Sequence, residues 1–112
     1  MKEGLRQHKS AECRVSIAYG LPDEMHEATR EIVAVKAGNA RKGHATALMH
    51  TVCAEADREW ITLIVNVKQF DEGMDDEKLK RWYSRFGFIE IQQEPCVLMV
   101  RSPEPARIAG MH

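Results

Sequence analysis

The sequence lacks the residues that several common kinds of functional site require. Its three cysteines, Cys13, Cys53 and Cys96, are odd in number and show no C-x-x-C spacing. A disulfide framework is therefore not expected, and free thiols fit a reducing cytosol. The five histidines show no ligand spacing with one another or with the cysteines, so we expect no metal site.

Long hydrophobic runs and an excess of one charge are also missing. No apolar segment approaches the roughly 20 residues that a membrane-spanning helix needs, and no signal-peptide pattern is present. The formal net charge is −1, whereas dedicated nucleic-acid binders are normally basic. The sequence therefore predicts a cytoplasmic protein with neither a membrane nor a nucleic acid as partner.

What the sequence does contain is sufficient for one globular domain. It has 112 residues, of which 44% are hydrophobic and 29% charged, the ordinary balance of a soluble protein with a single core. We expect one domain over residues 1–112. The polar residues 1–10 and the proline-containing residues 103–112 are predicted to be flexible tails.

The central part of the chain predicts a strand, a turn with glycine, a helix and a second strand. Ile32 to Val35 is an apolar, β-branched run typical of a buried strand. Apolar residues recur at helical spacing from Gly43 to about Arg58, and Ile61 to Val67 is apolar on both faces. Such a βαβ unit presents the first N–H groups of its helix to an anion, which indicates a phosphate-bearing ligand.

The flanking segments predict two hairpins and a second helix. Residues 14–19 alternate and should pair with the strand that ends near Ala37. Asp75 or Asp76 is a candidate N-cap for a helix that runs to about Arg85, with Gly87 at its end. Residues 89–91 and 96–100 should form a closing hairpin.

The glycine spacing from Gly38 to Gly43 is that of a P-loop, but the residues that perform its chemistry are absent. His44 and Ala45 occupy the places of the lysine and of the hydroxyl residue that binds magnesium. No G-x-G-x-x-G occurs either, so a dinucleotide site is not predicted. The remaining hypothesis for this turn is that its main-chain N–H groups bind a pyrophosphate, helped by Arg41 and Lys42.

Two motifs resemble those of a known family. Val33-Ala34-Val35 followed by Ala40-Arg41-Lys42-Gly43-His44-Ala45 resembles the acetyl-CoA-binding motif R/Q-x-x-G-x-G/A of the GNAT superfamily of N-acetyltransferases. Downstream, Tyr83-Ser84-Arg85-Phe86-Gly87-Phe88 is similar to the Y-x-x-x-G-F of that family. The resemblance covers roughly Arg30 to Arg101. Ala40 departs from the motif, which has Arg or Gln at that position.

The resemblance implies an α/β fold with a mixed, mostly antiparallel sheet, splayed at its middle beside a central βαβ crossover. It implies acetyl-CoA as co-substrate and direct acetyl transfer to a primary amine of a small molecule or of a protein, at a lysine or the N-terminus. The segment before the turn is shorter than in most members, so a homodimer could complete the acceptor site. The alternative is a non-catalytic acyl-CoA-binding or protein-interaction module on the same fold.

The resemblance also implies which residues hold the co-substrate. The strand near Val35 would bind the pantetheine arm, main-chain N–H groups from Arg41 to Thr46 the pyrophosphate, and an N–H near Val33 or Ala34 would face the oxyanion. Asn66 stands where the two strands should separate, although a solvated strand end explains it equally well. The predicted binding residues are Val33, Ala34, Val35, Arg41, Lys42, Gly43, His44, Ala45, Thr46 and Asn66.

Tyr83 and Glu31 are the candidate catalytic residues. Tyr83 would be the general acid for the leaving thiolate, and the alternative is an aromatic that only packs. Glu31 would be the base, on the same face as Val33 and Val35 if the strand is regular, with Glu27 further out. A sheet-end ion pair is the plainer explanation of Glu31. The acidic residues 71–77 either attract a cationic amine or cap and flank a helix start.

Overall fold

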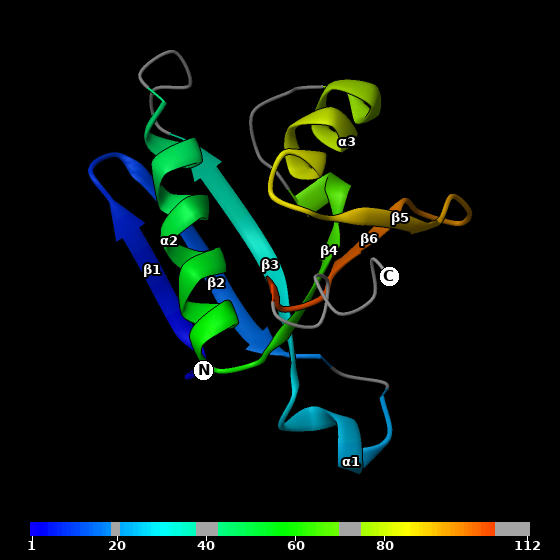
Figure 1. Ribbon diagram of the computed structural model, residues 1–112. Coiled ribbons are helices and arrows are strands. Elements are labelled where there is room, and N and C mark those ends of the chain that lie inside the picture. The colour runs from blue at the N-terminus through cyan, green and yellow to red at the C-terminus, as the bar shows by residue number, and fades with distance from the viewer. Residues whose placement is uncertain (19–20, 38–42, 70–74, 105–112) are drawn as a thin grey trace.

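The computed structural model describes residues 1–18, 21–37, 43–69 and 75–104. Within these ranges the chain is built from strands and helices, with a pair of consecutive strands at each end (Figure 1). The elements follow in the order β1 (Gly4–His8), β2 (Ala11–Ile17), α1 (Asp23–His26), β3 (Thr29–Ala37), α2 (His44–Arg58), β4 (Thr62–Asn66), the 3₁₀ turn η2 (Val67–Gln69), α3 (Asp76–Ser84), β5 (Ile89–Gln92) and β6 (Leu98–Arg101).

The strands form one mixed sheet in the order β1-β2-β3-β4-β6-β5. Strands β3 and β4 are parallel and are connected through α2, while the other described neighbours are antiparallel. This confirms the predicted mixed, mostly antiparallel sheet with a central βαβ crossover. It also confirms the two predicted hairpins, which are β2 with β3 and β5 with β6.

The two longer helices begin and end where local sequence signals place them. Helix α2 starts after Gly43, which has the left-handed backbone angle φ of 71°. Helix α3 starts after Asp75, whose carboxylate accepts a 2.8 Å hydrogen bond from the N–H of Lys78, as expected for an N-cap. Gly87 follows α3 with a φ of 93°, which only glycine adopts readily.

The core lies between one face of the sheet and the helices α2 and α3. Side chains from β2, β3, β4 and β6 on that face join one buried cluster with residues of both helices. The largest fully buried side chains include Tyr83, Phe88, Ile32, Met49 and Leu63. The cluster continues across the parallel pair β3 and β4, so the two helices are held on the same side of the sheet.

Residues 1–10 are not the flexible tail that their polarity predicted. Gly4–His8 forms the edge strand β1, which pairs antiparallel with β2. The strand is held through its main chain and through Arg6, whose guanidinium pairs with Glu55 of α2 at 2.9 Å. The pattern of hydrophobic residues could not predict this strand, because an ion pair rather than a row of buried apolar side chains attaches it to α2. Pro103 is likewise buried rather than part of a tail, and residues 105–112 lie outside the described residues.

Strand β3 is not regular, and this corrects the predicted placement of Glu31. Val15 pairs with Ile32 and Arg14 with Ala34, so Val33 is an extra residue in a β-bulge. Ile32 and Val35 are both buried in the core although they are three residues apart, which a regular strand would not allow. Glu31 therefore lies on the opposite face from Val35.

No helix in the described ranges is long and apolar enough to cross a membrane.

Candidate functional site

The parallel strands β3 and β4 separate after a short stretch of pairing. Thr29 to Ile32 of β3 match Thr62 to Val65 of β4, and beyond Ile32 strand β3 pairs with β2 alone. Figure 1 shows β3 and β4 diverging toward their carboxyl ends, with α2 beside one and α3 beyond the other. The carboxyl ends of parallel strands are where α/β sheets usually bind ligands. The separation therefore marks the candidate site, as the predicted splay required.

The first turn of α2 lies at one side of this separation. Gly43 precedes it, no side chain caps its N–H groups, and no acidic residue stands in its first turn. These features leave the positive end of the helix available to an anion. A Cβ at Gly43 would meet no atom within 4 Å, so its positive φ alone accounts for the glycine. The predicted ligands Arg41 and Lys42 lie outside the described residues.

The three side chains of that first turn have different surroundings. His44 Nδ1 lies 2.9 Å from the hydroxyl of Ser10, and its ring meets that of His8 edge-on. Ala45 is buried against the core. Thr46 accepts a 3.1 Å hydrogen bond from the indole N–H of Trp82 in α3. The turn is thus fixed from both sides, by the β1–β2 hairpin and by α3.

Tyr83 reaches the core from α3, and its hydroxyl has no hydrogen-bond partner. The side chain is fully buried, and Oη is the buried side-chain atom without a partner in the described part of the chain. Burial raises the pKa of the Tyr83 phenol, and the nearby Cys13 raises it further. An unpaired buried hydroxyl costs free energy, so this atom is a place where a ligand atom would be stabilising.

Glu31 lies on the other face of the sheet, directly beside the point of separation. It is matched to Ser16 on β2 and to Ile64 on β4. Partial burial raises the pKa of its carboxyl above the ordinary value. Glu27, the second candidate base, follows α1 as its C-cap and is not on β3. Tyr83 and Glu31 therefore face opposite sides of the sheet, and the gap between β3 and β4 lies between them.

The bulge leaves Val33 without a partner on the neighbouring strand. In the pairing of β3 with β2 the residues on either side of Val33 are matched, but Val33 is matched to none. The pairing with β4 ends at Ile32. A bulged residue leaves the regular ladder, so its main-chain groups are the ones that a ligand in the gap could use.

Asn66 ends β4 and organises the local chain. Its Oδ1 accepts a 3.0 Å hydrogen bond from the N–H of Lys68, which lies in the 3₁₀ turn η2. Its strand partner is Leu98 on β6. The described acidic residues near this end have comparable local roles: Asp75 caps α3, and Glu77 pairs with Lys80. Asp71 and Glu72 lie outside the described residues.

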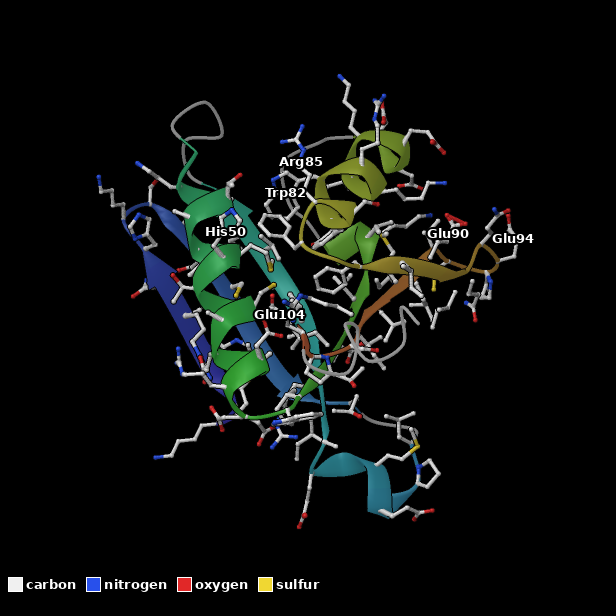
Figure 2. The ribbon with its side chains drawn as sticks, in the orientation of Figure 1. His50, Trp82, Arg85, Glu90, Glu94 and Glu104 are labelled. Atoms are coloured by element: carbon white, nitrogen blue, oxygen red, sulfur yellow. The ribbon has the colours of Figure 1, made fainter. Side chains whose placement is uncertain are left out.

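Sequence reasoning missed a basic face on α3. Lys78, Arg81 and Arg85 line a pocket of about 430 Å³ together with Trp82. Their spacing of three and four residues was a readable signal, because such residues share one face of a helix. Figure 2 shows Trp82 and Arg85 directed from α3 toward α2, with His50 on α2 opposite them.

A second pocket, of about 450 Å³, lies between α2 and the turn after α3. Its principal cation, Arg101, is already neutralised by a two-pronged pair with Asp57 and donates a 2.6 Å hydrogen bond to the carbonyl of Phe86. The charge of Arg101 in this pocket therefore serves the packing of the fold. No cluster of metal-ligating side chains occurs in the described ranges.

Comparison with known proteins supports the fold. The sequence matches no protein-family model and no curated protein. The structure is similar to a crystal structure from Staphylococcus aureus Mu50 described as a "putative acetyltransferase", with a TM-score of 0.55 and 14% sequence identity. The match covers 83% of this chain and 63% of that chain. At this identity the likeness shows the fold alone: the chain has an acetyltransferase-like α/β fold.

Proposed function

We propose that this chain is an N-acetyltransferase of the GNAT superfamily, which uses acetyl-CoA to acetylate a primary amine of a small molecule or protein. The observation that carries the proposal is the unpartnered Tyr83 hydroxyl, buried beside parallel strands that separate. The similar Staphylococcus aureus fold and the two sequence motifs support it. The acceptor could be a small amine, a protein lysine or a protein N-terminus.

The residues around the gap fit acetyl-CoA. The uncapped N–H groups of the first turn of α2, from His44 to Thr46, would hold the diphosphate with Arg41 and Lys42. The main-chain groups of Val33, which has no partner in the register of β3 with β2, would hold the pantetheine arm together with Ala34 and Val35. Asn66 would border it from β4. When bound, acetyl-CoA supplies a thioester carbonyl open to attack and a thiol that can leave.

The chain's own groups supply proton transfer and charge stabilisation. Because burial raises its pKa, the Tyr83 phenol stays protonated through the neutral range, which is the state of a general acid before it acts. The main-chain N–H at Val33 or Ala34 would donate to the developing oxyanion. Glu31, with a pKa raised by partial burial, would accept the proton of the amine.

The bulge explains why the proposed acid and the proposed base lie on opposite faces of the sheet. Acid and base are required at opposite ends of the reacting group, because one serves the thiol and the other the amine. Tyr83 lies on the helix-covered face and Glu31 on the other face. If the same sequence formed a regular strand without the bulge, Glu31 would lie on the same face as Val35.

The test is release of CoA thiol with a panel of amines, peptides and a protein acceptor. We expect turnover on at least one of them, and a fall of at least tenfold in kcat for Tyr83→Phe with little change in Kd for acetyl-CoA. Glu31→Gln should lower kcat and flatten the acidic limb of the pH–rate profile. If calorimetry finds no binding of coenzyme A or acetyl-CoA at millimolar concentration, the proposal is wrong.

A non-catalytic binding module on the same fold is the second candidate. It is favoured by two isoleucines on the edge strand β5, Ile89 and Ile91, which are 64% and 55% exposed. Exposed apolar residues in pairs are typical of contact surfaces. Binding of acetyl-CoA without turnover on any acceptor, together with retained binding in Tyr83→Phe, would select this candidate.

A further inference from the structure

The face of the sheet that lies opposite α2 and α3 is polar on one side of the gap and apolar on the other. The register carries one row of matched residues across five strands: Ser16 on β2, Glu31 on β3, Ile64 on β4, Val100 on β6 and Ile89 on β5. All five side chains are at least partly exposed, and none of them belongs to the buried core. Glu31 therefore lies at the boundary between polar and apolar side chains, next to the point where β3 and β4 separate.

A pocket of about 120 Å³ lies on the polar side of this face, formed by β1, β2 and β3. Arg14 and Lys36 line it together with Glu12, and the register places all three on the face of Glu31. Glu12 accepts a 3.2 Å hydrogen bond from the side-chain amide of Gln7. Arg14 and Lys36 are exposed, and neither forms an ion pair with a carboxylate in the described part of the chain. Two cations beside one carboxylate leave this pocket with an excess of positive charge.

The pocket cation Arg14 and the proposed base Glu31 are diagonal neighbours on paired strands. Arg14 stands two residues before Ser16 on β2, and Ser16 is matched to Glu31. Diagonal neighbours on antiparallel strands are about 7–8 Å apart, which is within the reach of long side chains. One small molecule can therefore contact both groups. The arrangement is complementary to a molecule that carries a carboxylate near a primary amine, because the planar guanidinium binds a carboxylate through two parallel hydrogen bonds.

We propose that the acceptor is an amino acid with an apolar side chain, bound through its carboxylate by Arg14 and acetylated on its amine. Lys36 would add a second positive charge to the carboxylate site, and the apolar side chain would lie against Ile64 and Val100. A polyamine or a protein lysine has no carboxylate beside its reacting amine and would not use Arg14 in this way. The inference rests on the proposed function and adds to it the chemical class of the acceptor.

The transfer step on such an acceptor balances with the groups already assigned. The amine nitrogen would form a bond to the acetyl carbon while the bond from that carbon to sulfur breaks. Tyr83 would give its proton to the departing thiolate. Of the two protons that the ammonium loses, one would pass through Glu31 to water and the other would restore Tyr83. The products are an N-acetyl amino acid and coenzyme A.

The test compares acceptors that differ at the carboxylate alone. Release of CoA thiol would give kcat/KM for leucine, for leucine amide and for 3-methylbutylamine, which is leucine without its carboxylate. We expect leucine to be preferred by at least about tenfold, the effect of charge-assisted hydrogen bonds to one carboxylate. Glycine, which has the carboxylate but no side chain, should be a poorer acceptor than leucine. The three amines differ in basicity, so the preference is also compared between the parent and its variants, where that difference cancels.

The decisive variant is Arg14→Gln, which should lower kcat/KM for leucine about tenfold and change it for 3-methylbutylamine by no more than about twofold. Arg14→Lys should keep part of the preference, because it retains the charge. Lys9→Gln is the matched control: Lys9 is exposed in the turn between β1 and β2, outside the pocket, and its loss changes the charge of the same hairpin equally. It should keep the full preference. All variants should retain the Kd for acetyl-CoA and the far-UV circular dichroism of the parent.

The outcomes separate this inference from the proposed function. A parent protein that acetylates 3-methylbutylamine as well as leucine, or only a peptide or protein, would overturn the inference and leave the proposed function in place. The same holds if Arg14→Gln lowers kcat/KM for both acceptors equally, or if Lys9→Gln lowers the preference as much as Arg14→Gln does. If acetyl-CoA does not bind, the proposed function fails and the inference fails with it.

Discussion

Trp82 and Thr46 join α2 to α3 across the gap between the parallel strands, through a 3.1 Å hydrogen bond from the indole N–H to the threonine hydroxyl. Helix α2 follows β3, and α3 follows β4. The bond therefore connects the two halves of the molecule at the end where the sheet itself no longer does. A molecule that enters the gap from this side must pass next to it.

Replacing Thr46 with valine should destabilise the fold by about 1 kcal/mol, the usual worth of one partly buried hydrogen bond. Urea unfolding at neutral pH would measure the change. Thr51→Val is the matched control: its hydroxyl donates to the Ala47 carbonyl within the same helix, at 3.2 Å. Equal effects of the two substitutions would show that the connection between the helices contributes nothing.

Asp57→Ala should cost about 3 kcal/mol or more in the free energy of unfolding. It leaves the guanidinium of Arg101, 3% exposed, without its counter-charge, and uncompensated buried charges are strongly destabilising. Asp57 stands near the carboxyl end of α2, where a negative charge opposes the helix dipole, and its carboxylate is held there by Arg101 and by the N–H of Glu104. The control is Arg58→Ala, one residue along and exposed, which should cost less than about 1 kcal/mol. Thermal unfolding would separate them.

Tyr83→Phe should leave stability unchanged or raise it by up to about 1 kcal/mol, because it removes a buried hydroxyl that has no partner. The same substitution is expected to lower turnover. Chemical denaturation of the two proteins, without ligand, would measure the first effect. A loss of more than 1 kcal/mol would mean that the hydroxyl has a structural partner and would weaken the case for a general acid.

The carboxyls of Glu31 and Glu55 should affect the pH dependence of stability in opposite directions. Desolvation raises the pKa of the Glu31 carboxyl, so this carboxyl holds its proton more tightly in the folded state than in the unfolded state. As pH rises from the unfolded-state pKa to the folded-state pKa, Glu31 therefore lowers the free energy of unfolding. The hydrogen bond from Arg6 lowers the pKa of Glu55, so its contribution is present above the unfolded value and is lost as pH falls through the folded one. Denaturation curves from pH 3 to 7 would test this. Glu31→Gln should gain relative stability toward pH 7, and Glu55→Gln should lose it; the reverse pattern would contradict both assignments.

Local sequence signals predicted most of the fold. The apolar stripe of α2, the Asp75 cap and the glycine after α3 act within a few residues, so they can be read without the rest of the chain. Strand β1 could not be predicted, because Arg6 finds its partner Glu55 only after folding. Tyr83 was identified through its motif, but its unpaired hydroxyl depends on distant neighbours.

The bulge and the basic face mark two other limits of sequence reasoning. Regular alternation predicted one face for Glu31, Val33 and Val35, and a bulge changes that alternation without altering composition. Lys78, Arg81 and Arg85 share a face by simple spacing, but only the structure shows that, among the residues it describes, Glu77 and Glu90 pair with Lys80 and not with these three cations.

The extra residue at Val33 has a consequence for engineering and for aligning this chain with others. Deleting Val33 would give a regular strand in which Ile32 still pairs with Val15 and Ala34 still pairs with Arg14. Val35 would then stay in the core and Lys36 outside it, so the packing against α2 should be retained. A counterpart whose strand is regular here should therefore have one residue fewer between Ile32 and Gly43, and a one-residue gap placed there would mark the bulge rather than a misalignment.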